Sequence, residues 1–277
     1  MHHDFNTDQI IMRALTEDIG TGDVTTNSVV PKGQLIQGHF KAKEEGVLCG
    51  LEIVRRVFAL MDDKVVFESD YQDGDLVHKG TIIAKISGPA AAILTGERVA
   101  LNFMQRLSGI ATQTHAMVQR VASTSTVIVD TRKTTPGLRV LEKYAVKAGG
   151  GGNHRMNLSD GILIKDNHIK AAGGIKSAVE AARKHAPRTI KVEVEVESTE
   201  QVQQALDAGA DIIMLDNMEL ETMRKAVEMV RGRALTEASG NMDRKDLLEV
   251  ARTGVDMISV GALTHSVKAL DISLKFT

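Results

Sequence analysis

Charged and small polar residues follow each of six short apolar runs in the second half of this 277-residue chain. Such runs, alternating with amphipathic stretches, are typical of parallel strands, whose carboxyl ends meet at one edge where active sites form. Any one of these residues could be a helix cap or a surface charge, but six groups together predict a functional site. The groups are Asp130, Arg132 and Lys133; Lys165 and Asp166; Glu195 and Glu197; Asp216 and Asn217; Glu237 and Ser239; and Ser259 and Gly261.

The charges in this set suit a phosphorylated anion. Four basic residues supply cations, and guanidinium forks match the oxygens of carboxylates and phosphates. Two carboxylates among them indicate Mg²⁺, which proteins commonly hold with one or two acids plus substrate phosphates. The sequence therefore predicts a substrate that carries pyrophosphate, with Mg²⁺ bound by Glu195 and Asp216 together with substrate phosphates and water. The basic residues are Arg132, Lys133, Arg155 and Lys165.

Glycines near the strand ends support phosphate binding. The segments ASGN at 238–241 and SVGA at 259–262 expose backbone N–H groups at helix starts, although each tetrapeptide alone is a weak signal. A run of four glycines, Gly149 to Gly152, comes shortly before His154 and Arg155. It indicates a hinge or a close backbone approach to a ligand, with a flexible linker as the alternative. Taken alone, His154 is better interpreted as a surface or structural histidine.

The elements that must position these residues are strands at 126–133, 161–167, 190–198, 211–217, 234–240 and 256–262, separated by amphipathic helices. An open doubly wound sheet and a β/α barrel both satisfy that pattern. The strand IKVEVEVES places Glu193, Glu195 and Glu197 on one face and valines on the other. Glutamates buried under helices would be costly, so the strand favours a barrel with a polar lumen; an exposed edge strand is the alternative.

The first part of the chain predicts a small α+β domain. A helical pattern at 8–15 is followed by turn-rich sequence and short alternating runs such as QLIQGHFKAK and GTIIAKISG. Residues 96–123 predict two helices interrupted at Gly109, where the domain boundary is expected. Residues 71–88 show a DGDxVxKG hairpin pattern that biotin and lipoyl carriers also use, and we interpret them as a structural sandwich hairpin, with a carrier function as the alternative.

Composition excludes several classes of protein. The 34 basic and 36 acidic residues leave a net charge of −2, which argues against a protein that coats nucleic acid. With no Trp and 3% aromatic residues, there are few platforms for stacking bases. The single cysteine, Cys49, fits a reducing compartment. Neither a signal peptide nor a membrane span is evident, so we expect a cytoplasmic protein.

The block TRKTTPGLRVLEKYAVKAGGGGNHRMNLSDGILIKDNHI at 131–169 resembles the quinolinate phosphoribosyltransferases of NAD synthesis. The resemblance continues in EDIGTGDVTT (17–26), GERVALNFMQRLSGIAT (96–112), KVEVEVES (191–198), DIIMLDN (211–217), EASGN (237–241) and SVGALTHSVKALDISLKF (259–276). It implies an α/β fold with an N-terminal α/β sandwich domain at 1–109, joined by the C-terminal segment 268–277. It also implies an incomplete (open) α/β barrel of parallel strands at 110–267. The implied reaction joins quinolinate to phosphoribosyl pyrophosphate and releases CO₂, giving nicotinate mononucleotide and pyrophosphate.

The resemblance also implies roles for individual residues. Arg132, His154, Arg155 and Lys165 correspond to the quinolinate pocket, completed by Arg98 from the partner subunit of a homodimer. The phosphoribosyl pyrophosphate and Mg²⁺ side corresponds to Thr131, Lys133, Glu195, Asp216, Ser239, Gly240, Asn241, Ser259, Val260 and Gly261, with Lys133, Glu195 and Asp216 as catalytic residues. Asn241 stands where some members carry a second glycine; the useful group there is the backbone N–H.

Other functions remain open at this point. One is a Schiff-base aldolase barrel that uses Lys165 or Lys133, and another is a carrier module built on residues 71–88. The nearest is a paralogous phosphoribosyltransferase that acts on a different heteroaromatic carboxylate. The sequence also leaves open whether dimers assemble into hexamers, the order of substrate binding, and whether decarboxylation is concerted or enzyme-assisted.

Overall fold

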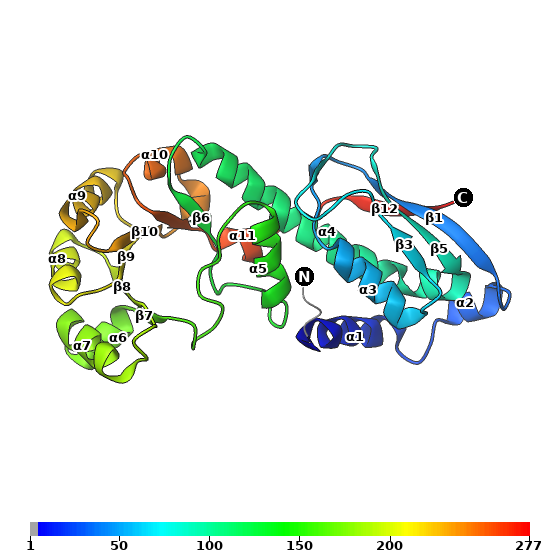
Figure 1. Cartoon of the computed structure of the whole chain (residues 1–277), viewed down its shortest axis with the longest axis horizontal. Helices are drawn as coiled ribbons and strands as arrows, with labels where there is room; N and C mark the ends of the chain where they lie inside the picture. The colour runs from blue at the N-terminus through cyan, green and yellow to red at the C-terminus, as the bar shows by residue number, and fades with distance from the viewer. Residues whose placement is uncertain (1–4) are drawn as a thin grey trace. The chain divides into compact units, whose positions relative to one another are not determined.

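A computed structural model describes residues 5–277, which form two compact units. The first unit comprises the chain up to His115 with Thr135–Gly150 and Ser266–Thr277, and the second comprises Ala116–Thr134 and Gly151–His265. Figure 1 shows the elements of both units. Within residues 5–277 no helix combines the length and the apolar character needed to cross a bilayer.

The first unit is built on a four-stranded antiparallel sheet in the order β12, β1, β5, β3. β1 spans Leu35–Ala42, β3 spans Val66–Glu68 and β5 spans Ile82–Pro89. The edge strand β12, Ile272–Phe276, comes from the end of the chain and pairs with β1 from Gly38↔Phe276 to Ala42↔Ile272. The last residues therefore complete the sheet of the first unit, as the resemblance implied.

Helices cover one face of this sheet, so the first unit is an α/β sandwich (Figure 1). They are α1 (Phe5–Ile19), α2 (Val24–Val29), α3 (Leu51–Met61) and the first part of α4 (Ala90–Val121). The ring of Phe58 on α3 meets that of Phe40 on β1 edge to face, with centroids 6.3 Å apart. Both rings are buried, so their contact joins the helix layer to the sheet.

The prediction of two helices interrupted at Gly109 is wrong, because α4 runs unbroken from Ala90 to Val121. A Cβ on Gly109 would lie 2.2 Å from the carbonyl oxygen of Lys268. The glycine therefore lets the C-terminal segment pass against the helix instead of ending the helix. Local sequence could not show this, because the neighbour is far away in the chain.

Gly109→Ala is expected to lower the free energy of unfolding by about 1–3 kcal/mol, the usual cost of forcing atoms into a packed site. Gly161→Ala is the matched control, since the nearest atom to a new Cβ there is 3.8 Å away. Urea unfolding of both variants measures the difference. Equal stabilities would show that the Lys268 segment moves aside without cost.

The domain boundary expected from the sequence assigns residues 110–267 to the barrel. The structure instead places α5, Arg139–Ala148, in the first unit. Two polar contacts within that unit fix α5. The buried Glu142 accepts hydrogen bonds from Arg106 on α4, and Tyr144 Oη donates to Asp73 Oδ2 at 2.8 Å. These pairings determine which neighbours the helix meets.

The hairpin predicted for residues 71–88 does not form. β4 (Leu76–Val77) pairs with β2 (Gly46–Val47), whereas β5 pairs with β1 and β3. The two strands of the motif therefore belong to different sheets. The motif is part of the first unit, but it forms two strands of different sheets and not a hairpin.

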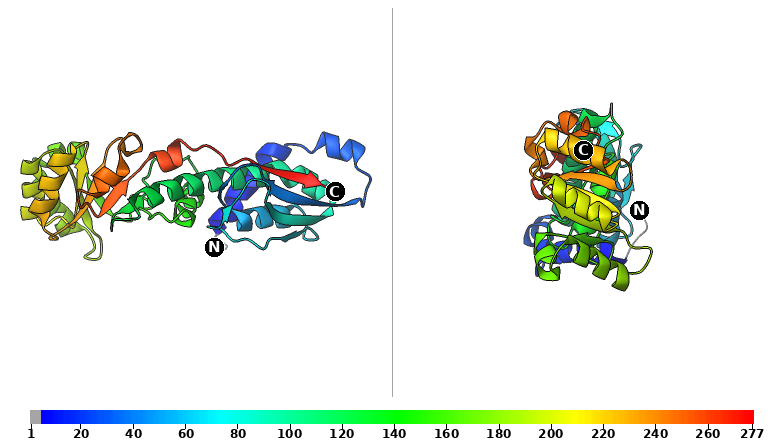
Figure 2. Two further views of the ribbon diagram at one scale, coloured as in Figure 1. Left: turned by 90° about the horizontal axis from the view of Figure 1, so that it is seen from above. Right: turned by 90° about the vertical axis from the view of Figure 1, so that its left-hand side faces the viewer.

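The second unit contains a six-stranded parallel sheet in the order β6, β11, β10, β9, β8, β7. Its first and second strands along the chain, β6 and β7, form the two edges, so the barrel is incomplete. Figures 1 and 2 show the helices outside a curved sheet. The strands are β6 (Val127–Val129), β7 (Ile162–Ile164), β8 (Val192–Val196), β9 (Ile212–Asp216), β10 (Leu235–Ser239) and β11 (Met257–Ser259). The helical segments are α6 (Asp166–Ala172), α7 (Ile175–His185), α8 (Thr199–Asp207), α9 (Leu220–Val230), η1 (Met242–Arg244), α10 (Leu247–Ala251) and α11 (Ala262–His265).

The glutamate face of β8 confirms the open barrel with a polar lumen. β8 lies between β7 and β9, so the alternative of an exposed edge strand is wrong. Val192, Val194 and Val196 are fully buried on the helix side. Glu193 and Glu195 lie on the other face, where a doubly wound sheet would have a second helix layer.

Candidate active site

Two adjoining pockets lie at the carboxyl ends of the barrel strands, and they share Thr131, Lys133, Lys165, Ser239 and Ser259. The arginine pocket has a volume of about 160 Å³, and the carboxylate pocket of about 400 Å³. The arginine pocket is lined in addition by Arg132, His154, Arg155, Leu163, Met214 and Glu237. The carboxylate pocket is lined in addition by Glu195, Asp216, Asn217, Gly240, Asn241, Met242, Asp243, Arg244, Gly261, Ala262 and His265.

The structure thus brings together all but two of the residues that the resemblance assigns to the site, whereas Asp130, Asp166 and Glu197 of the predicted strand-end groups line neither pocket. Val260 is buried and lines neither pocket. Arg98 is exposed on α4 of the first unit and also lines neither. Glu193 and Glu237 meet at the arginine pocket; Glu237 was among the predicted strand-end residues, whereas the sequence assigned Glu193 no role there. The period-two pattern was the available signal, since each lies two residues before a predicted site residue on the same face of its strand.

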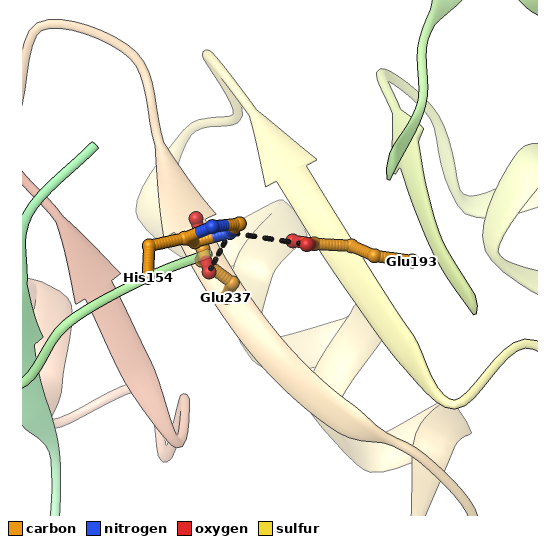
Figure 3. Close-up of side chains that lie close together, drawn as sticks. All are labelled: His154, Glu193 and Glu237. Atoms are coloured by element: carbon orange, nitrogen blue, oxygen red, sulfur yellow. Dashed lines mark ion pairs between the residues drawn. The ribbon is translucent and has the colours of Figure 1, made fainter. Parts of the chain in front are cut away.

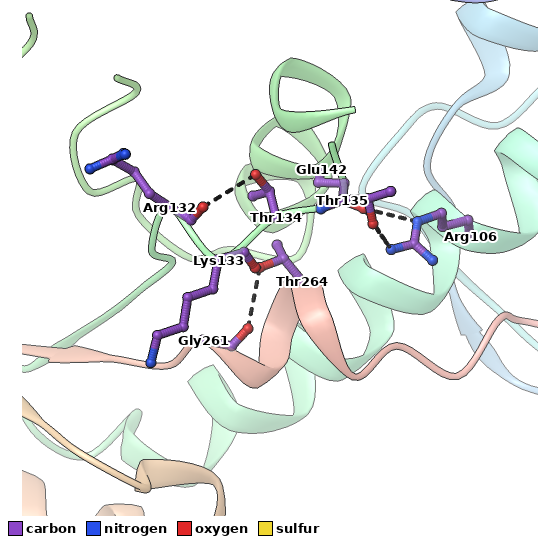
Figure 4. A network of polar contacts seen from close by, with 8 residues as sticks. All are labelled: Arg106, Arg132, Lys133, Thr134, Thr135, Glu142, Gly261 and Thr264. Carbon is purple, nitrogen blue, oxygen red and sulfur yellow. Dashed lines mark hydrogen bonds and ion pairs between the residues drawn. The ribbon is translucent and has the colours of Figure 1, made fainter. Parts of the chain in front are cut away.

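The Arg132–Lys133 turn is held by hydrogen bonds to its backbone (Figure 4). Lys133 N donates to Thr131 Oγ1 at 3.0 Å, and the buried Thr264 donates from Oγ1 to the Lys133 carbonyl at 2.8 Å. The Lys133 side chain passes over Gly261, where a Cβ would lie 3.0 Å from Lys133 Cδ. The turn that presents the arginine and the lysine is thereby tied to the β11 end.

The next residues along the chain are fixed within the first unit, as Figure 4 also shows. Thr135 N donates to Glu142 Oε2 at 3.0 Å, and Arg106 Nη2 donates to Thr135 Oγ1 at 2.6 Å. Glu142 is fully buried and pairs with Arg106 at 2.6 Å. The buried carboxylate of Glu142 has both a charged partner and a backbone donor, so it holds the backbone at Thr135 firmly in place.

The charges of the two pockets are partly paired. Lys165 Nζ, at the start of α6, forms an ion pair with Glu195 Oε2. Asp216 Oδ2 accepts a hydrogen bond of 2.7 Å from the side-chain amide of Asn217. Burial and the neighbouring charge of Arg132 both lower the pKa of Arg155. An anionic carboxylate bound beside Arg155 would offset the lowering of its pKa.

The β9 and β10 ends meet at Gly240, which requires a glycine. Its φ is +95°, and a Cβ would lie 2.2 Å from Asn217 Oδ1 and 2.9 Å from the Asn217 backbone nitrogen. Asn241 donates from its side-chain amide to Asn217 Oδ1 at 3.2 Å. The close approach brings the β9 and β10 ends together at the wall of the carboxylate pocket, which Asn217, Gly240 and Asn241 line.

Gly240→Ala is expected to raise KM for the phosphorylated substrate and to lower kcat/KM by at least about 10-fold, because the turn must move by around an ångström. Gly209→Ala is the matched control. Gly209 has a φ of +79° but nothing within 4 Å of a new Cβ. That variant should lose stability and keep wild-type kinetics. Steady-state kinetics with each substrate varied in turn will decide, and a wild-type KM in Gly240→Ala would contradict the role of the turn.

A buried cluster of His154, Glu193 and Glu237 lies at the arginine pocket (Figure 3). His154 Nε2 is 3.0 Å from Glu193 Oε2 and 3.4 Å from Glu237 Oε2. Burial by itself lowers the pKa of His154, but hydrogen bonds with the two glutamates raise it to about 10. Burial raises the pKa of Glu193, although its hydrogen bond with His154 acts in the opposite direction.

Carboxylates that could hold a metal occur at two places in the second unit. Within residues 5–277, His154, Glu193 and Glu237 form the one group of three such side chains whose ligand atoms lie within 4.8 Å of one another. Glu195 and Asp216 offer hard oxygen donors in the carboxylate pocket, but they belong to no such group. They therefore fit a Mg²⁺ ion only if substrate and water supply the remaining ligands.

The fold and these pockets define an α/β-barrel enzyme with two adjoining pockets lined by cations and carboxylates. Models of the quinolinate phosphoribosyl transferase N-terminal and C-terminal domains match residues 23–108 and 110–275. The chain belongs to the quinolinate phosphoribosyltransferase family.

Relatives and solved structures agree with this assignment. A Bacillus subtilis protein named "Probable nicotinate-nucleotide pyrophosphorylase (carboxylating)" is 50% identical over 94% of this chain and 90% of its own. The chloroplastic nicotinate-nucleotide pyrophosphorylase (carboxylating) of Arabidopsis thaliana is 44% identical over 99% of this chain and 84% of its own. The crystal structure of NadC from Streptococcus pyogenes is 46% identical, with a TM-score of 0.93, over 99% of this chain and 97% of that one.

Proposed function

We propose that the protein transfers a phosphoribosyl group from phosphoribosyl pyrophosphate to quinolinate with loss of CO₂, giving nicotinate mononucleotide and pyrophosphate for NAD synthesis. The observation that carries this proposal is the pair of adjoining pockets with five shared residues. One pocket offers arginines for a dicarboxylate, and the other offers glycine turns and carboxylates for a pyrophosphate and its cation. The shared residues lie where the two reactants would meet.

The arginine pocket orients quinolinate. Arg132 and Arg155 present guanidinium groups whose paired N–H donors match carboxylates in two-point contacts. Lys165 reaches both pockets, and it exchanges its Glu195 partner for an anionic oxygen when substrate binds. The pocket thus holds the pyridine nitrogen toward the shared residues.

The carboxylate pocket promotes departure of pyrophosphate. The turns at Ser239–Asn241 and Ser259–Gly261 donate backbone N–H groups to phosphate oxygens, and Lys133 places a cation between the two pockets. Glu195 and Asp216 would hold Mg²⁺ together with substrate phosphates and water, and bound Mg²⁺ neutralises the leaving oxygens. The same carboxylates stabilise the positive charge that develops on the ribose.

Decarboxylation follows from the charge of the product ring. The quinolinate nitrogen forms the new bond to ribose C1 as the bond to pyrophosphate breaks, so the ring becomes a pyridinium. The C2–carboxylate bond then breaks, CO₂ leaves, and the electron pair stays at C2, where the adjacent ring cation stabilises it. C2 takes up one proton, and no further cofactor is needed to balance the reaction.

The proposed scheme includes a homodimer with shared active sites. Arg98 is exposed on α4 and lines neither pocket of its own chain, so it is available to the pocket of a partner. We expect the enzyme in the cytoplasm. Its single cysteine, Cys49, is buried and forms no disulfide, which suits a reducing compartment. Dimers and hexamers are both compatible with this arrangement.

Incubation of the protein with quinolinate, phosphoribosyl pyrophosphate and Mg²⁺ should yield nicotinate mononucleotide, and omission of any one component should abolish the product. Other pyridine and pyrrole carboxylates, offered at the same concentration, test for a paralogue with a different substrate. The proposal would be overturned if quinolinate gave no mononucleotide while another carboxylate was turned over.

A further inference from the structure

Arg244 is a cation of the carboxylate pocket to which neither the strand-end pattern nor the family resemblance assigns a role. It lines this pocket and not the arginine pocket. Its side chain is 82% exposed, and its one ion pair within residues 5–277 is with the adjacent Asp243, whose Oδ2 lies 4.0 Å from Arg244 Nε. Such a loose pair between exposed neighbours contributes little, so the guanidinium is available to an anion.

The backbone that carries Arg244 is fixed. The Arg244 N–H donates to the Asn241 carbonyl at 3.0 Å, and the side chain of Met242 between them is buried. The next residue, Lys245, donates from Nζ to the Met218 carbonyl at 3.3 Å and lines neither pocket. Of these two neighbouring basic residues, Arg244 is therefore the one that offers its charge to the carboxylate pocket.

The carboxylate pocket has little positive charge to spare for a phosphate. Lys165 is already paired with Glu195, so Lys133 and Arg244 remain to balance the other acids. Loss of Arg244 would leave the acidic side chains in excess. Apart from His265, the ionisable residues of the pocket are the acids Glu195, Asp216 and Asp243 and the bases Lys133, Lys165 and Arg244.

The strand order separates the acids proposed to hold Mg²⁺ from Arg244. Glu195 and Asp216 lie on β8 and β9, whereas Arg244 follows β10, which pairs with the opposite edge of β9. A pyrophosphate that carries Mg²⁺ suits the β8 and β9 side, because the metal needs oxygen donors. The phosphate on ribose C5 brings no metal, so it needs a cation of the protein. Arg244 also lies outside the arginine pocket, as expected for a group that binds the end of the ribose remote from C1.

We propose that Arg244 is a substrate-binding residue that donates paired N–H groups to the phosphate on ribose C5 of phosphoribosyl pyrophosphate. This phosphate is unchanged by the reaction, so the contact is equally strong in the ground state and the transition state. Uniform binding of this kind lowers KM and leaves kcat unchanged. The inference rests on the proposed function, because it concerns how the same donor substrate is held.

Arg244→Ala is expected to raise the Kd of phosphoribosyl pyrophosphate by about 10-fold, the scale of a charge-assisted hydrogen bond at an exposed site. Equilibrium dialysis without quinolinate or Mg²⁺ measures this Kd in the absence of turnover. In steady-state assays KM for this substrate should rise equally, while kcat and KM for quinolinate stay within about twofold. Arg244→Lys keeps the charge without the planar fork, so it should lose about threefold.

Arg252→Ala is the matched control. It removes the same charge from an exposed arginine of the second unit that lines neither pocket and pairs with Glu249 at 2.7 Å. Its Kd for phosphoribosyl pyrophosphate should equal that of the wild type. An unchanged Kd in Arg244→Ala, or an equal rise in Arg252→Ala, would overturn the inference.

Competition with the two halves of the donor identifies the phosphate that Arg244 binds. Ribose 5-phosphate and inorganic pyrophosphate each displace phosphoribosyl pyrophosphate in the dialysis experiment. Arg244→Ala should weaken ribose 5-phosphate about 10-fold and pyrophosphate by less than about twofold. Equal weakening of both, or weakening of pyrophosphate alone, would overturn the inference. If ribose 5-phosphate bound in an Arg244-dependent manner but the wild type gave no product from quinolinate, the proposed function would fail and the phosphate contact would stand.

Discussion

Arg132→Ala and Arg155→Ala are each expected to lower kcat/KM for quinolinate by at least 30-fold, about 2 kcal/mol, the scale of a lost charge-assisted hydrogen bond. Both guanidinium groups line the arginine pocket. Loss of either leaves a substrate carboxylate in a partly buried site without its two-point partner. Because the substrate must be held through both bond formation to ribose and loss of CO₂, kcat and KM should both change.

Lysine variants at the same positions separate charge from geometry. Arg132→Lys and Arg155→Lys keep the cation but lose the planar fork, so they should recover only part of the activity. Arg224→Ala is the control, because this arginine lies on α9 outside both pockets and pairs only with Glu221 among the ion pairs of the described chain. If either alanine variant kept turnover close to wild type, the substituted arginine would not be needed to hold the quinolinate carboxylates.

Much of this pocket was predictable because parallel strands impose a simple geometry. Polar residues at successive strand ends must converge, and the alternation in IKVEVEVES could not be buried under two helix layers. Glu195 and Asp216, on neighbouring strands β8 and β9, accordingly line one pocket. Here local sequence and global fold agree, so the residues could be placed before the structure was known.

Features that depend on distant neighbours could not be predicted in this way. Gly109 resembles a helix break, yet its purpose is close contact with Lys268. Glu193 lies inside its strand and was assigned no role, and only the position of His154 on a separate loop brings it together with Glu237. A sequence pattern gives the face on which a side chain lies, but not which residue of another segment meets it.

Lys133→Ala is expected to lower kcat by at least about 100-fold, because Lys133 lines both pockets and supplies a cation where pyrophosphate departs. Arg98→Ala should also be strongly impaired if Arg98 completes the quinolinate site of a partner. Each homodimer would then contain two defective sites. The defects differ in origin, since one removes a barrel residue and the other removes a residue of the first unit.

Mixing the two inactive variants under conditions that exchange subunits should restore about a quarter of wild-type activity, because half of the dimers become mixed and each mixed dimer holds one complete site. That site combines the barrel of the Arg98→Ala chain with Arg98 of the Lys133→Ala chain. Mixing Arg132→Ala with Lys133→Ala is the control, because both residues lie in one barrel and no mixed dimer then contains an intact site. Recovery in the first mixture alone would place Arg98 across the subunit interface. The absence of recovery in both, with exchange verified by mass spectrometry, would show that each chain builds its site without its partner.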